Sequence, residues 1–350
     1  MSRGIRPFRR AARNAATLLC SSAAFAIAIE AADQELQVPA APVRAVAARS
    51  DTGAAPRTPW GDPDLQGIYT SATYTPLERP PELAGKEFFT AEEAAAFAQK
   101  SLKELFDQSA DAIHYDDALW QSEATPQGLS SLRTSLVVDP PNGRIPQLTP
   151  EAQQRASAST QARRRGPADG PASRLLSERC IVWRHEGPPM LVPVYASMYQ
   201  IVQSPGYVVI VQEMTHNARV IPLAGGPPLS PSIHQYGGDS RGRWEGETLV
   251  VEVANFNDKA DFRNAANIRS EALRVVERFT RVDDTTILYE FTVNDSKTFT
   301  APWSAEFPLM AARGPVLEYA CHEGNYGLAN ILSAARAEEA AAGAARGGAR

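Results

Sequence analysis

The segment from residue 198 to residue 330 alternates runs of β-forming residues with turn signals, and this pattern constrains the fold most. Pro205-Gly206, Asp283-Asp284 and Asn294-Asp295 supply turns between neighbouring runs. About eight successive strands with short links predict an antiparallel meander that curls or closes, because closure removes unpaired edges. The predicted fold class is mainly β, an antiparallel barrel-like sheet with a helical, loop-rich N-terminal part. The predicted strands occupy residues 199–203, 207–214, 219–222, 243–244, 247–255, 273–282, 285–293, 299–307 and 316–321.

Two helices are predicted in the N-terminal part. Thr90 followed three residues later by Glu93 has the spacing of a capping box and predicts a helix over residues 91–107. Pro150 is placed as the first residue of a second helix, which is expected to end near Arg165. Neither helix carries residues that point to a particular chemistry.

The first 32 residues are typical of a secretory signal peptide. Basic residues without an acidic one precede an apolar run from residue 15 to residue 29, and small residues follow. This run is shorter than the about 20 residues that a membrane helix needs, so no stable membrane span is predicted. Arg9-Arg10 leaves the twin-arginine route open as an alternative. The expected location is periplasmic or secreted.

The remaining chain divides by composition. Residues 33–57 are rich in Ala, Pro and Val and predict a disordered leader. Residues 58–335 form the single β-rich globular domain, and residues 336–350 are expected to be a disordered tail. The net charge of −5, without a basic stripe, disfavours nucleic acid as a partner.

Removal of the signal peptide leaves two cysteines, Cys180 and Cys321. An even pair in a chain bound for an oxidising compartment predicts a disulfide. Two buried free thiols are the alternative, because the pair has no spacing motif. A bond would join the start of the β-rich region to its end.

Glu213, His216 and Arg219 lie close together where the strand predicted at 207–214 ends. Side chains at a strand end can converge on a cavity mouth, and a histidine with a nearby carboxylate suits general acid–base chemistry. Glu213 would orient or assist the histidine. The structural alternative is a hairpin corner held by a carboxylate–guanidinium pair.

His322, Asn325 and Tyr326 follow the last predicted strand, among two glycines that permit unusual backbone angles. His322 is the strongest candidate for a catalytic residue, and Asn325 and Tyr326 are candidates for substrate binding. The alternative is a strand-to-helix linker in which Asn325 caps the final helix.

Zinc or iron held by the two histidines is the alternative to proton transfer. The ligand types suit either metal, but no His-x-His or His-Glu-x-x-His spacing occurs, so no metal and no other cofactor is predicted. The sequence also lacks a Gly-x-Ser-x-Gly elbow, a phosphate-binding loop and a dinucleotide fingerprint, which disfavours serine hydrolases and nucleotide enzymes.

Three further candidates for ligand contact lie between these clusters. His234 is part of a long loop rich in Gly, Pro and Ser, and such loops are often lids or binding loops, although a plain surface histidine is the alternative. Arg243 and Trp244 precede a tight turn. Arg243 or Arg219 is expected to stabilise developing negative charge. The segment 114–117, with His114, is another polar cluster that solvated loop residues explain equally well.

Four segments carry a resemblance to a known family: residues 60–67, 199–206, 242–252 and 318–326. With GRWEGETLVVE as its most specific segment, the chain resembles a large family of exported bacterial proteins of uncharacterised activity. The resemblance spans residues 58–335. It implies export and a lipocalin-like or related β-barrel, and it implies no reaction.

Two functions follow as hypotheses. The first is a periplasmic enzyme that acts on a small apolar or aromatic molecule in the barrel cavity by acid–base lyase, isomerase or dehydratase chemistry, with His322 and His216 as the proton-transfer pair. The second is a periplasmic small-molecule-binding protein without turnover, in which the same polar residues orient the ligand.

Overall fold

The structure is a computed structural model that describes residues 56–106, 131–165, 168–193, 195–223, 226–259, 269–312 and 314–347. The predicted signal peptide, nearly all of the predicted leader and the segment 114–117 lie outside the described residues.

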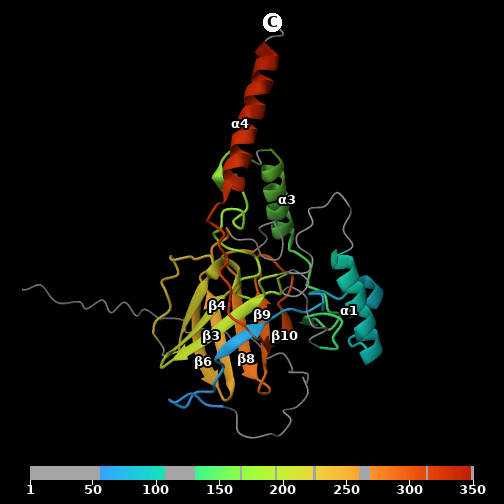
Figure 1. The fold of residues 1–350 in the computed structure, drawn as a ribbon, viewed down its shortest axis with the longest axis vertical. Coiled ribbons are helices and arrows are strands. Elements are labelled where there is room, and N and C mark those ends of the chain that lie inside the picture. Colours follow the sequence, from blue (N-terminus) through green and yellow to red (C-terminus); the bar gives the residue numbers. More distant parts are fainter. Residues whose placement is uncertain are drawn as a thin grey trace, which may run out of the picture. The chain divides into compact units, whose positions relative to one another are not determined.

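The described residues form a mainly β fold with a few helices (Figure 1). The α-helices are α1 (Ala91–Phe106), α3 (Pro150–Arg165) and α4 (Tyr326–Gly347), and the short 3₁₀ helices are η1 (Pro81–Leu83), η2 (Pro171–Ser173) and η3 (Met214–His216). The strands are β1 (Gly67–Thr70), β2 (Val137–Asp139), β3 (Met198–Ser204), β4 (Tyr207–Gln212), β5 (Ala218–Pro222), β6 (Asp239–Glu245), β7 (Thr248–Ala254), β8 (Arg274–Arg281), β9 (Thr286–Asn294) and β10 (Trp303–Ala311).

The strands form one antiparallel sheet in the order β5-β4-β3-β1-β10-β9-β8-β7-β6, with β2 added alongside β10. The sheet curls into a nearly closed barrel, as the sequence predicts (Figure 1). All neighbouring pairs on this path are antiparallel. A path of nine strands therefore ends with β5 and β6 running in the same direction.

The two end strands meet at a seam that side chains close instead of a hydrogen-bond ladder. The described strands β5 and β6 are not paired. They approach closely at Gly242, where an added Cβ would lie 2.8 Å from Leu223 Cδ2 and 2.9 Å from Ile221 Cγ2. Glycine at this position lets β6 approach β5 without a shift of these two side chains. Strand β5 is short and ends in Pro222. A short edge strand and a proline both protect a sheet edge from pairing with another chain.

Period-two alternation along the strands places aromatic and aliphatic side chains inside the barrel. In β9, Tyr289 and Phe291 point inward, and the centroid of the Tyr289 ring lies 4.9 Å from that of Phe279 and 5.1 Å from that of Phe307. Trp303 is fully buried beside Phe291. Packed rings thus occupy the described part of the interior, where the sequence hypothesis placed a ligand cavity.

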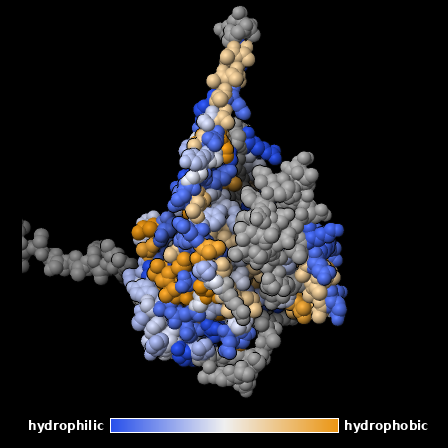
Figure 2. Space-filling view, viewed as in Figure 1, coloured by the Kyte–Doolittle hydropathy of each residue, from blue (hydrophilic) through white to orange (hydrophobic). Residues whose placement is uncertain are grey.

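The outer surface of the barrel has two chemically different parts. On β6, β7 and β8, Arg243 and Arg278 form ion pairs with exposed glutamates. On β3, β4 and β5 the outward positions carry no charge, and Val202, Val209 and Val220 form a row across the strands. Figure 2 shows this apolar area over β3 and β4.

Several local predictions are confirmed. The β3–β4 hairpin turns at Pro205-Gly206, with Gly206 at a φ of 81°. The capping box forms at α1, where the Thr90 N–H donates to Glu93 Oε2 at 2.8 Å and the Glu93 N–H donates to Thr90 Oγ1 at 3.3 Å. The helix predicted from Pro150 is α3. These features depend on contacts within a few residues.

Two strand predictions are wrong. The strand predicted at 299–307 begins at Trp303, because residues 295–299 instead form a turn in which the Asp295 carbonyl accepts N–H groups of Thr298 and Phe299. Residues 316–321 form no strand. Helix α4 extends into the segment predicted as a tail, as far as Gly347.

A buried ion pair crosses the barrel interior from β5 to β8. The Arg219 guanidinium donates two hydrogen bonds to the Glu277 carboxylate, at 2.7 and 3.2 Å, and the Glu277 side chain is fully buried. The Tyr289 hydroxyl donates to Glu277 Oε1 at 2.6 Å and accepts the Met190 N–H at 2.9 Å. Burial, followed by the Glu277 charge, raises the pKa of Tyr289 well above its ordinary value. The pair ties β5, a strand of the open seam, to β8.

We expect Arg219→Met to lower the free energy of unfolding by about 3–5 kcal/mol, because it leaves the Glu277 charge buried without a partner. Arg219→Met/Glu277→Met should recover most of that loss. The control is Arg243→Met, which removes an exposed ion pair and should cost at most about 1 kcal/mol. Urea denaturation of the four proteins measures these differences. Equal losses in Arg219→Met and Arg243→Met would contradict the role of the buried pair.

Candidate functional site

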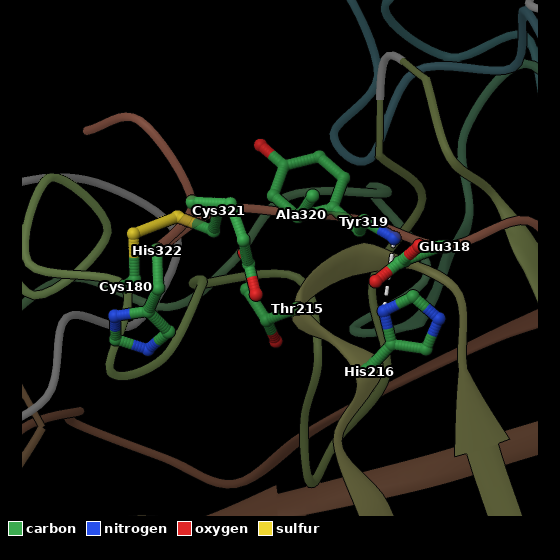
Figure 3. A pocket seen from close by; sticks show the side chains of 9 residues that line it. Cys180, Thr215, His216, Glu318, Tyr319, Ala320, Cys321 and His322 are labelled. Atoms are coloured by element: carbon green, nitrogen blue, oxygen red, sulfur yellow. Dashed lines mark hydrogen bonds between the residues drawn. A yellow bond between two sulfur atoms is a disulfide. The ribbon is translucent and has the colours of Figure 1, made fainter.

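A pocket of about 480 Å³ lies at the end of the barrel where β4 gives way to β5 (Figure 3). Two segments far apart in sequence meet there, the η3 turn and residues 317–321, which we call the strap. A loop at Cys180 contributes the third side. The residues that line the pocket are Cys180, Thr215, His216, Glu318, Tyr319, Ala320, Cys321, His322 and Glu323.

The Glu213 carboxylate holds the strap against the barrel. Its Oε1 accepts the Leu317 N–H at 3.1 Å, and its Oε2 accepts the Met198 N–H at 3.3 Å. Glu213 is buried and does not line the pocket. The predicted catalytic assistant therefore joins the start of β3 to the strap, a role that positions the pocket wall.

His216 makes the second contact with the strap. Its Nδ1 accepts the Tyr319 N–H at 2.9 Å. An imidazole nitrogen that accepts a hydrogen bond carries no proton, so the ring is neutral in this geometry and its proton resides on Nε2. Thr215 and His216 have φ values of 61° and 54°, in the left-handed region that side chains other than glycine rarely adopt. This strained turn aims His216 at the strap.

The two strap contacts also explain why residues 316–321 are not a strand. The N–H groups of Leu317 and Tyr319 are spaced by two residues, as in a β-ladder. Their acceptors, however, are the side chains of Glu213 and His216 instead of the backbone of a neighbouring strand. An extended sequence pattern predicts the two-residue spacing of these N–H groups. It cannot predict that their acceptors are side chains.

The disulfide predicted from the sequence is present between Cys180 and Cys321, with the Cα atoms 5.7 Å apart and a sequence separation of 141. Beside it, the Asn325 amide donates to the Glu178 carbonyl at 3.2 Å and contacts Cys180 Sγ at 3.5 Å. Asn325 Oδ1 accepts the Leu328 N–H at 3.3 Å. Asn325 therefore caps α4, as the structural alternative in the sequence analysis states.

His322 lies beside the disulfide, while His216 lies on the other side of the pocket with Thr215 between them (Figure 3). The structure thus brings the two predicted histidines to one pocket without a hydrogen bond between them. Within the part of the chain that the structure describes, the exposed His322 side chain makes no hydrogen bond and no ion pair.

The other predicted site residues lie elsewhere. Arg219 and Trp244 face the barrel interior. Arg243 is exposed on the outer surface, His234 Nε2 donates a hydrogen bond to the Pro231 carbonyl in an exposed loop, and Tyr326 is 75% exposed at the start of α4. None of these five side chains lines the pocket.

A buried carboxylate supports the turn that carries His216. Glu186 accepts hydrogen bonds from the Trp183 N–H at 2.7 Å, from the Asn217 amide at 3.1 Å and from the Thr215 hydroxyl. Burial raises the pKa of Glu186, and these hydrogen bonds oppose that shift. Glu186 is not predictable as a site residue from local sequence, because it is about thirty residues away from the turn that it stabilises.

An aromatic row runs behind the strap. The ring of Trp183 packs edge-on against Tyr195 at 6.3 Å, and Tyr195 stacks on Tyr319 at 6.5 Å. Only Tyr319 of the three lines the pocket. The sequence analysis missed this row and also missed Glu318, although Glu318 and Tyr319 lie within four residues of the selected His322.

Comparison with protein-family models, with curated proteins and with solved structures found no match for this chain. The family resemblance drawn from the sequence therefore stays a prediction. Among the described residues, no three His, Cys, Asp or Glu side chains come together in a way that could hold a metal ion. None of the described helices is long and apolar enough to cross a membrane.

We expect the stability of the protein to fall as the pH falls from about 6.5 to about 4 in a manner that depends on His185. Burial, followed by the charge of Arg184, lowers the pKa of His185 from 6.5 to about 4. Between these values the unfolded chain binds a proton at this residue and the folded chain does not, so acid favours unfolding.

The measurement is the urea midpoint at pH 7 and pH 5 for the wild type and for His185→Gln. The variant should lose less stability than the wild type on acidification, and His234→Gln, in an exposed loop, should behave as the wild type does. The comparison between variants cancels the opposite contribution of Glu186, whose raised pKa favours the folded state in acid. Equal acid losses in all three proteins would contradict this account.

We expect Cys180→Ala/Cys321→Ala to lower the free energy of unfolding by about 3–5 kcal/mol, because the unfolded chain regains the freedom of a long loop. Hydrogen exchange at the Leu317 and Tyr319 amides should also become faster, since the strap loses its covalent anchor. The Val275 amide, in β8 inside the sheet, is the internal control. Faster exchange at the strap than at Val275 would show local opening of the strap, separate from global unfolding. Unchanged exchange at the strap would show that Glu213 and His216 hold it without the disulfide.

Proposed function

We propose that the protein is an exported small-molecule-binding protein, located in the periplasm, whose ligand occupies the pocket under the strap. The observation that carries the proposal is the pocket itself, which falls within the size range of about 300–1,000 Å³ typical of ligand sites. Its wall combines hydroxyl, imidazole, carboxylate and phenol groups with a covalently anchored strap. The Cys180–Cys321 disulfide supports export, because such bonds persist in oxidising compartments.

Binding is favoured over proton transfer by the hydrogen bonds already present. A general base needs a free lone pair near the reacting proton. Nδ1 of His216 is engaged by the Tyr319 N–H, and Glu213 is buried outside the pocket lining, where its oxygens accept backbone N–H groups. His216 can donate from Nε2 to a ligand, and Thr215, whose hydroxyl proton is donated to Glu186, can accept. These groups orient a ligand without a change in protonation.

Acid–base catalysis of a lyase or isomerase type is the second candidate, and His322 is the observation that favours it. Its imidazole is exposed at the pocket and is not engaged by another described residue. Glu323 and Glu318 also line the pocket and could act as partners in proton transfer. In this candidate His322 moves the proton, and His216 only orients the substrate.

The test is ligand-detected NMR with a library of small polar and aromatic compounds, followed by calorimetry of the compounds that bind. We expect His322→Ala and Tyr319→Leu to weaken binding by about tenfold or more, because each removes a contact worth at least about 1.4 kcal/mol. His234→Ala is the matched control, since that histidine lies in an exposed loop outside the pocket.

Binding that is unaffected by both pocket variants would contradict the proposal, and so would the absence of any bound compound. Bound compounds are also incubated with the wild type and analysed for products. Turnover that His322→Ala abolishes, with affinity retained within about tenfold, would replace simple binding by the catalytic candidate.

A further inference from the structure

Three contacts hold the strap, at every second residue, and they respond differently to a proton. The Leu317 N–H is donated to Glu213. The Tyr319 N–H is donated to Nδ1 of His216, and the disulfide fixes Cys321 (Figure 3). A carboxyl group keeps acceptor oxygens with or without a proton, and a disulfide does not titrate. An imidazolium carries hydrogen on both nitrogens and accepts nothing, so a proton removes only the middle contact.

The turn that carries His216 is held independently of the strap. Glu186 accepts hydrogen bonds from the Thr215 hydroxyl and the Asn217 amide, on either side of the histidine. The His216 side chain is itself exposed, so a proton reaches it from solvent without any opening of the barrel. Of the strap, the residues Leu317, Glu318 and Ala320 are exposed, and little packing opposes its release. Loss of the contact is therefore expected to free the strap and to leave the turn in place.

The charges around His216 compete with this hydrogen bond. The titratable side chains that surround it are Glu213 and Glu186 on the barrel side and Glu318, His322 and Glu323 in the pocket. Among the described residues that line the pocket there is no lysine or arginine. Negative charge favours the imidazolium, and the Tyr319 N–H favours the neutral ring. Proton uptake and strap contact exclude each other, so the contact weakens as the pH falls.

We propose that His216 is a pH-sensitive latch of the strap. The neutral ring holds the Tyr319 N–H and keeps residues 318–320 in the pocket wall. The imidazolium releases these residues, while Glu213 and the disulfide keep both ends of the strap attached. The change falls in the range of about pH 5 to 8 in which histidines gain charge. The latch regulates access to the pocket, a consequence that rests on the proposed function.

The experiment is NMR of the full chain with nitrogen-15 in histidine, tyrosine and valine, titrated from about pH 8 to about pH 5. Imidazole nitrogen shifts report charge and tautomer, and a scalar coupling across the N–H···N hydrogen bond reports the contact itself. Near pH 8 we expect a neutral His216 ring, protonated on Nε2 and coupled to the Tyr319 nitrogen. As the imidazolium forms, the coupling should vanish. The range ends above the pKa of His185, which burial lowers to about 4.

Hydrogen exchange at the Tyr319 amide, compared with an unstructured peptide at the same pH, measures release of the strap. We expect its protection to fall by about threefold to tenfold over the titration, as loss of one hydrogen bond predicts. The Val275 amide, in β8, reports global unfolding and should keep its protection over the same range. A fall at Tyr319 without a fall at Val275 identifies local opening of the strap.

His216→Asn is the decisive variant. Asn Oδ1 accepts a hydrogen bond without titrating, and asparagine adopts the left-handed region more readily than most residues, which suits the φ of 54° here. Tyr319 protection should stay within about threefold of the wild type near pH 8 and should no longer depend on pH. His216→Ala removes the acceptor and should give low protection throughout. His234→Asn, in an exposed loop, should behave as the wild type does.

An acid-induced loss of Tyr319 protection that persists in His216→Asn would overturn the inference, because another group, such as Glu186, would then be the sensor. A Tyr319 amide that stays protected after the His216 ring has become an imidazolium would overturn it too. The same holds for a ring protonated on Nδ1 near pH 8, and for a ring that stays neutral to about pH 5.

These measurements need no ligand, so they decide the latch whatever the library screen finds. Compounds that bind are then titrated near pH 8 and near pH 5.5. Affinity that falls in acid in the wild type but not in His216→Asn would support regulation of the pocket, and an equal fall in both would overturn it. If the latch fails, binding that depends on His322 leaves the proposed function standing. If no compound binds, a working latch stands without the proposed function.

Discussion

The pocket depends on two side chains just after β4 that accept backbone N–H groups of an extended segment, in the place of a neighbouring strand. Glu213 and His216 take the N–H groups of Leu317 and Tyr319, so the strap lies across the end of the barrel without joining the sheet. Were the strap a regular strand, its residues would pair with β-edges and no space would remain beneath it. The disulfide at Cys321 then fixes the far end of the strap over the same space.

The odd number of strands on the sheet path governs the rest of the barrel. An antiparallel path of nine strands brings β5 and β6 together in parallel, and they pack through side chains at Gly242. The buried pair of Arg219 and Glu277 links this weakly closed seam to β8. Arg219 therefore stabilises the wall from which the η3 turn projects, whereas the sequence hypothesis gave it a role in binding substrate.

Sequence reasoning succeeded where the determinants are local or periodic. The capping box at Thr90 and the turn at Gly206 depend on residues within a few positions, and the alternation of β9 depends only on a period of two. It also selected His216 and His322, which do meet in one pocket. It failed to find Glu186, because a hydrogen bond to Asn217 across about thirty residues leaves no local pattern.

The sequence by itself predicted the antiparallel barrel, the pairing of Cys180 with Cys321, and the neighbourhood of the candidate histidines. These properties follow from periodicity, turn chemistry and the number of cysteines, all of which can be read along the chain. Only the tertiary structure decided that Glu213 is a structural acceptor and that Glu318 and Tyr319 line the pocket. Each of these depends on which side chain reaches which partner across a distance in sequence, and side-chain direction at a strained turn such as Thr215 is set by the surrounding fold.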